Sequence, residues 1–243
     1  MSSYRNNPNF IFNDYPCVPV TWFPVGNKKL AESRCRKLQE DGVKIVRVGV
    51  DYANGISKRN AKWYKWLLST LNIDFEVEPC FINPESKNSE VIYKPMLVEA
   101  IETFVHNYGE TFNSVGLWRY EQEQFTTYNV ENIYEQDFVF AISWTKHLGK
   151  KVNLGGISPS DFNWITRMIS CHVFNNVGTI YVEYREEDHC LHNQMFGRIL
   201  TNIFEAKGFD ISIRSLQQTD STYEMLNPWE AKSASPNTTL KIS

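Results

Sequence analysis

Two patterns of hydrophobic and polar positions alternate along the chain. Short apolar runs rich in β-branched residues predict β-strands, and longer segments in which apolar residues recur every three or four positions predict amphipathic helices. The predicted strands lie at residues 18–25, 43–52, 74–82, from 115 onward, 151–157, 179–186 and 210–215. The predicted helices lie between them, at residues 27–41, 59–71, 94–108, about 133–148, about 160–174 and about 191–207.

The regular alternation of strand and helix predicts an α/β fold with a parallel sheet, because helical crossovers of this length join parallel strands. Seven such strands in 243 residues fit a (β/α)8 barrel of the TIM type better than an open sheet. The eighth unit has two alternatives: the C-terminal TTLKIS closes the ring, or the barrel is incomplete or irregular there. No repeat or linker divides the chain, so we expect one domain over residues 1–243.

Composition and charge argue against several classes of protein. With 42% hydrophobic and 22% charged residues, the chain is typical of a globular protein. The net charge of -3 and the lack of a basic tract argue against nucleic acid or a membrane surface as a partner. The first residues do not follow the pattern of a secretory signal, and no apolar run approaches the roughly 20 residues of a membrane-spanning helix. We therefore expect a cytoplasmic protein.

The residue patterns favour no metal and no cofactor. Five cysteines without a CxxC pair fit reduced thiols better than a zinc ribbon or a disulfide framework. His189 and His192 lie three residues apart at an expected helix start, where capping explains the acidic and turn-forming neighbours. Gly155 and Gly156 lack the frame of a phosphate-binding loop. We therefore predict that the protein works without a metal or cofactor.

Polar and aromatic residues gather where the predicted strands end. In a (β/α) barrel the carboxyl ends of the strands form the working face, because the loops that follow them surround one funnel. Aromatic rings cover the apolar faces of a sugar, and carboxylates accept hydrogen bonds from its hydroxyls. We therefore predict a carbohydrate site lined by Trp22, Arg47, Asp51, Glu78, Trp118, Arg119, Tyr120 and Arg185.

The segment FVHNYGETFNSVGLWRYEQEQF at 104–125 resembles the fourth-strand region of retaining glycoside hydrolases of clan A, in particular the β-xylosidase and α-L-iduronidase group. In that group a helix ending in Tyr-Gly precedes a strand that closes on Trp-Asn-Glu-Pro. VRVGVDYANG, the WYKWLL helix and KKVNLGGISP resemble neighbouring elements, so that the likeness spans about residues 18–190. The resemblance implies a TIM barrel that acts on glycosides through two carboxylates.

The catalytic motifs of that family are degenerate in this chain. The family's acid/base glutamate stands two places after the tryptophan, where this chain has Tyr120, and Glu121 follows one step later. One step reverses the side-chain direction in a strand, so Glu121 serves as the acid only if a bulge or the loop re-aims it. The family's nucleophile is a glutamate on the seventh strand, where ISIRSLQQTD has none. Glu183 is the best substitute, and Glu121 and Glu183 form the candidate catalytic pair.

Three functions are open at this point. The first is a carbohydrate-active barrel that acts on a glycoside or a sugar-containing intermediate, for instance in polysaccharide biosynthesis. The second is a glycosidase-like protein that binds a sugar or a sugar-containing small molecule without cleaving it, which the missing seventh-strand glutamate favours. The third is a sugar isomerase or epimerase that uses the same carboxylates for proton transfer.

Overall fold

The computed structural model of the protein describes residues 10–11, 20–52, 58–82, 94–118, 128–157, 162–170, 172–183 and 190–216. Strands and helices alternate through these residues, as predicted. The strands are β1 (Phe10–Ile11), β2 (Ile45–Asp51), β3 (Glu76–Ile82), β4 (Ser114–Trp118), β5 (Lys151–Ile157), β6 (Val177–Glu183) and β7 (Ser212–Leu216). The helices are α1 (Lys28–Glu40), α2 (Lys58–Leu71), α3 (Lys94–Tyr108), α4 (Tyr128–His147), α5 (Phe162–Ser170) and α6 (Cys190–Ala206), with the short 3-10 helices η2 (Gly109–Thr111) and η4 (Val173–Asn176).

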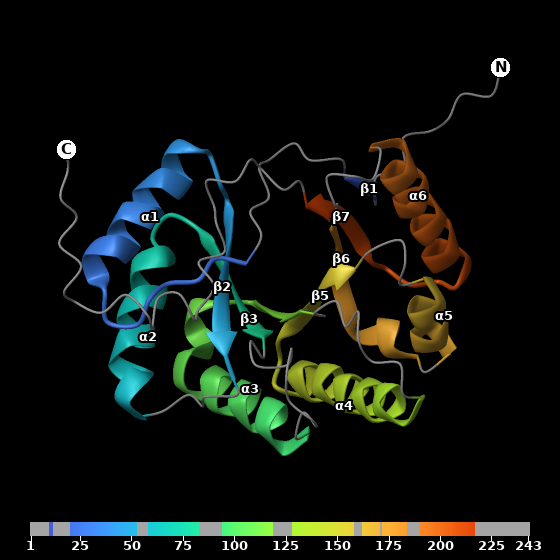
Figure 1. Ribbon diagram of the computed structural model, residues 1–243, viewed down its shortest axis with the longest axis horizontal. Coiled ribbons are helices and arrows are strands. Elements are labelled where there is room, and N and C mark those ends of the chain that lie inside the picture. The colour runs from blue at the N-terminus through green and yellow to red at the C-terminus, as the bar shows by residue number, and fades with distance from the viewer. Residues whose placement is uncertain are drawn as a thin grey trace.

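The strands form one sheet in the order β1-β7-β6-β5-β4-β3-β2. Every pair of neighbouring strands is parallel. From β2 to β7 the order in space follows the order along the chain, as in a (β/α) barrel. Figure 1 shows the helices arranged on the outside of the strands. The prediction of an α/β fold built on a parallel sheet is confirmed.

The N-terminal segment meets both edges of this sheet. Phe10 and Ile11 pair with β7, and Thr21 forms a parallel bridge with Val48 of β2. In that bridge the Thr21 N–H donates to the Arg47 carbonyl at 2.7 Å, and the Gly49 N–H of β2 donates to the Thr21 carbonyl at 3.0 Å. The protein is therefore a TIM-type barrel with an irregular join between its first and last units. The TTLKIS tail, the other candidate for the join, lies outside the described residues.

The strand predicted at residues 18–25 is wrong over most of its described part. Within residues 20–25 only Thr21 pairs with the sheet, through its bridge to β2. Pro24 has no N–H to donate to a strand ladder, and its carbonyl accepts from the Asn27 N–H at 3.1 Å. Gly26 then adopts a φ of +84°, which turns the chain into α1. The β-branched composition of the segment is thus overridden by this turn.

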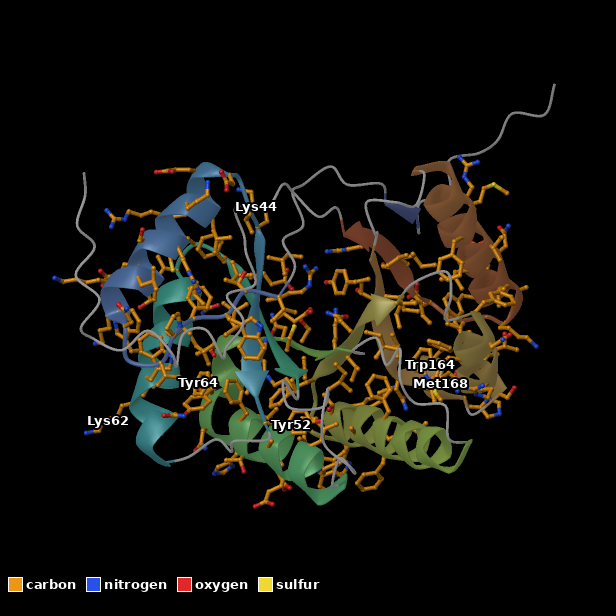
Figure 2. The ribbon with its side chains drawn as sticks, in the orientation of Figure 1. Lys44, Tyr52, Lys62, Tyr64, Trp164 and Met168 are labelled. Carbon is orange, nitrogen blue, oxygen red and sulfur yellow. The ribbon has the colours of Figure 1, made fainter. Side chains whose placement is uncertain are left out.

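The helices bury one face against the sheet. In α1 the buried positions are Ala31, Cys35 and Leu38, at the spacing that the sequence predicted. Figure 2 shows the same division elsewhere: Trp164 and Met168 of α5 lie on the side toward the strands, where they are buried, while the exposed Lys62 projects outward from α2. None of the helices in the described ranges combines the length and apolarity needed to cross a membrane.

Alternate residues of the strands face two environments. On β2, Val46, Val48 and Val50 belong to the apolar core shared with the helices. Arg47 and Gly49 alternate with them and therefore face the inside of the barrel. The inside is polar in part, and the candidate site is built on this inner face and on the strand ends above it.

Candidate functional site

Three of the predicted site residues are the last residues of their strands. Asp51 ends β2, Trp118 ends β4 and Glu183 ends β6. In the strand register Asp51 pairs with Ile82, and Trp118 pairs with Gly155. Because all the strands are parallel, these carboxyl ends lie at the same end of the barrel. In (β/α) barrels this end carries the active site.

Four further predicted residues lie outside the described residues. These are Arg119, Tyr120, Glu121 and Arg185. For Glu183 the structure describes the backbone position at the end of β6. The pairing of Glu121 with Glu183 therefore stays a prediction.

Arg47 and Glu78 form an ion pair inside the barrel. They are neighbours in the register of β2 and β3, and the Arg47 Nε lies 3.4 Å from the Glu78 Oε1. The two side chains are 0% and 1% exposed, so the pair is closed off from water. A buried ion pair needs further hydrogen bonds to offset the desolvation of both charges.

Glu78 finds those hydrogen bonds on the next two strands. The Ser114 hydroxyl of β4 donates to its Oε2 at 3.2 Å, and the Asn153 side-chain amide of β5 donates to the same oxygen. Cys80, two residues along β3, places its thiol 3.8 Å from the other carboxylate oxygen. Burial raises the pKa of this thiol well above its usual value, so Cys80 packs as a neutral group. One carboxylate thus ties β3, β4 and β5 together.

Tyr181 of β6 completes this polar cluster. The guanidinium carbon of Arg47 lies 3.6 Å from the centre of the Tyr181 ring, a cation–π contact. β2 and β6 are separated by three strands in the sheet, so the contact exists only because the sheet curls round on itself. Burial raises the pKa of the Tyr181 phenol, and the charge of Glu78 raises it further, against a smaller opposing effect of Arg47 and Arg214. The phenol is therefore a neutral hydrogen-bonding group in this interior.

Trp22 lies over the inner face of β2. The side chain is half-buried and packs with Val20 and Cys80. A Cβ added at Gly49 would come within 2.6 Å of its ring, so only glycine leaves room for the indole there. The Trp22 carbonyl accepts a hydrogen bond from the Arg34 guanidinium of α1. The irregular N-terminal join thus places an aromatic side chain against the barrel interior.

Sequence reasoning missed three residues of the interior cluster. Ser114, Asn153 and Tyr181 contact Glu78 or Arg47 but were not among the predicted site residues. Asn153 carried a usable signal, because it is a polar residue within the apolar strand KVNLGGI. Ser114 and Tyr181 carried none that separates them from ordinary strand residues. Arg47 and Glu78 were predicted to line the carbohydrate site, and the structure instead joins them in an ion pair closed off from solvent.

We expect Gly116→Ala to disturb this cluster. An added Cβ would lie 3.0 Å from the Glu78 Oε1 and would collide with the Cys80 sulfur. Overpacking of this kind costs about 1–3 kcal/mol of unfolding free energy, which urea denaturation measures. Gly178→Ala is the matched control, because its added Cβ would have its nearest neighbour at 3.6 Å. The control should be unchanged or up to about 1 kcal/mol more stable, and equal losses in both variants would contradict the expected collision.

Possible metal ligands do not cluster in the described ranges. No group of three or more histidine, cysteine, aspartate or glutamate side chains within them is placed to hold a metal ion. His189, part of the motif considered in the sequence, lies outside those ranges.

Comparisons with known proteins give a weak similarity of fold. No protein-family profile matches the chain, and neither does any curated protein. Among solved structures, a 3-keto-D-glucoside 4-epimerase from E. coli is 12% identical with a TM-score of 0.45, and covers 84% of this chain and 83% of its own. A sugar phosphate isomerase/epimerase from Parabacteroides distasonis is 9% identical with a TM-score of 0.44, and covers 89% and 97%. A beta-1,4-mannanase from the sea hare Aplysia kurodai is 14% identical with a TM-score of 0.45, and covers 89% of each chain. Similarity at this level assigns neither a family nor an activity to this protein.

Proposed function

We propose that the protein is a carbohydrate-active barrel that binds a sugar at the carboxyl ends of its strands and acts on a glycoside there through Glu121 and Glu183. The observation that carries this proposal is the buried cluster around Arg47 and Glu78. It lies inside the barrel: Arg47 precedes Asp51 on β2, and Tyr181, whose ring Arg47 contacts, precedes Glu183 on β6.

The energetics of the cluster support a role beyond stability. Replacing a buried ion pair by well-packed apolar residues is often neutral or stabilising, so an apolar layer would hold the barrel at least as well. A polar network whose members are hydrogen-bonded to one another does something an apolar layer does not, because it fixes the direction of each side chain. Arg47 and Glu78 thereby form a rigid floor for groups at the strand ends.

The two candidate carboxylates would then divide the chemistry. Glu121 would donate a proton to the leaving oxygen, and Glu183 would attack the sugar carbon or activate a water molecule. A separation of roughly 5 to 5.5 Å between their carboxyl groups gives retention of configuration, and roughly 6.5 to 9.5 Å gives inversion. The configuration of the first product therefore reports the separation.

A second candidate is a barrel that binds a sugar without cleaving it. The observation in its favour is Tyr120, which occupies the place where the resembling family carries its acid/base glutamate. In this reading the floor of the barrel and the aromatic residues serve binding alone.

One set of assays on the wild-type protein separates these functions. A panel of nitrophenyl glycosides tests cleavage, proton NMR follows the configuration of products and any isomerisation of free sugars, and thermal shifts test binding. Release of nitrophenol supports the glycosidase, and thermal shifts without turnover support the binding protein. Conversion of a free sugar into its isomer would instead support a sugar isomerase or epimerase. If the protein neither binds nor converts any of the glycosides and sugars tested, the proposed function is overturned.

A further inference from the structure

We propose that Arg214 of β7 binds an anionic group of the ligand inside the barrel, so that the favoured sugar carries a carboxylate or a phosphate. The inference rests on the proposed function, since it specifies the chemical class of the sugar at the same site. It starts from the position, partners and exposure of this one side chain.

Arg214 is placed on the inner face of the barrel. Its neighbour Ile213 is buried in the core shared with the helices, so the alternate residue faces the other way. In the register of the sheet Arg214 pairs with Tyr181, whose ring contacts Arg47. The charge of Arg214 also lowers the pKa of the Tyr181 phenol in part, which places the guanidinium close to it. Arg214 therefore borders the cluster of Arg47 and Glu78.

Arg214 differs from Arg47 in its partners. In the part of the chain that the structure describes, the Nε atoms of both arginines are buried without a hydrogen-bond partner, but Arg47 has the Glu78 carboxylate as its counter-charge. Glu78, the carboxylate of the cluster, already accepts from Ser114 and Asn153 and pairs with Arg47. A guanidinium has five N–H donors, and leaving a buried donor unmatched is unfavourable. A ligand oxyanion at the exposed part of the guanidinium would supply the counter-charge that Arg47 has in Glu78.

Arg214 also differs from Arg47 in its access to solvent. Arg47 is fully buried, whereas Arg214 is partly exposed, so solvent reaches part of the second side chain and not the first. Arginine presents two parallel N–H donors that match the two oxygens of a carboxylate or phosphate. Desolvation on one side, by the barrel wall, strengthens such a pair. The ligand group that fits Arg214 is therefore an oxyanion.

Binding measurements on matched sugars test this inference. Calorimetry compares glucuronate and glucose 6-phosphate with glucose, and galacturonate with galactose, for the wild type and for Arg214→Gln. We expect an anionic sugar to bind at least tenfold more tightly than its neutral parent, and Arg214→Gln to remove this preference. Arg214→Lys should keep part of it, because the charge stays while the two-pronged geometry is lost. Comparing the affinities of the uronates with that of glucose 6-phosphate shows whether a carboxylate or a phosphate is preferred.

Two controls keep the result interpretable. Arg198→Gln removes the same charge from an exposed position on α6 and should leave every affinity unchanged. Thermal unfolding of Arg214→Gln should match the wild type, because the Nε that the substitution removes has no hydrogen-bond partner within the described residues. A large loss of melting temperature would show that Arg214 holds the fold together, and would overturn the inference.

The remaining outcomes distinguish this inference from the proposed function. Equal binding of neutral and anionic sugars, unaffected by Arg214→Gln, overturns the oxyanion site and leaves the carbohydrate-active barrel standing. Binding of inorganic phosphate or acetate that depends on Arg214, without binding of any sugar, supports the oxyanion site and overturns the proposed function. Absence of binding by all of these probes overturns both.

Discussion

Arg47→Met is expected to lower the free energy of unfolding by about 3–5 kcal/mol, because it leaves the Glu78 carboxylate buried without its counter-charge. Both side chains are closed off from solvent, so water cannot take the place of the guanidinium. The variant also loses the contact with the Tyr181 ring. Urea unfolding followed by tryptophan fluorescence measures the loss, and the midpoint should shift without a change in slope.

The chain offers a matched control for this prediction. Lys37 and Asp41 form an ion pair at 3.6 Å on the exposed side of α1, and Lys37→Met should change stability by less than about 0.5 kcal/mol. The double variant Arg47→Met/Glu78→Gln should lose less than the sum of its two single variants, by about 0.5–3 kcal/mol, because neither charge is then left alone. A loss in Arg47→Met no larger than in Lys37→Met would contradict a buried, coupled pair.

Glu121→Gln is expected to reduce cleavage of the best nitrophenyl glycoside by about 10²–10⁴-fold, the usual contribution of a general acid. This corresponds to about 2.7–5.5 kcal/mol of activation free energy. The loss should shrink on a dinitrophenyl glycoside, since that leaving group departs without protonation. Glu183→Gln should impair both substrates alike, because a nucleophile or base acts on the sugar side of the bond. Initial rates under subsaturating substrate measure these differences.

The neighbouring Glu123 is the control for this pair. Glu123→Gln makes the same chemical change two residues further along the chain. It should retain wild-type cleavage on both substrates. If Glu121→Gln and Glu123→Gln behave alike, or if the loss does not depend on the leaving group, Glu121 is not the acid.

The regular elements of this protein could be predicted from sequence because their signals are local. The buried stripe of Ala31, Cys35 and Leu38 repeats at the helical period, and β2 shows the dense valine pattern of a strand covered on both sides. Alternation of such elements leaves few topologies, among which the parallel barrel fits this length. The failure at residues 22–25 has a local cause as well, because Pro24 and the turn at Gly26 outweigh the β-branched composition.

The sequence by itself therefore determined the order of strands and helices, while the gathering of polar residues at the carboxyl ends of the strands stays a prediction. Only the tertiary structure decided which polar residues meet. Arg47 reaches Tyr181 because the sheet curls until β2 and β6 face each other, and Glu78 reaches Asn153 across β4. The curvature that brings distant strands face to face depends on the twist and packing of the whole sheet, and the local patterns that predict single elements do not encode it.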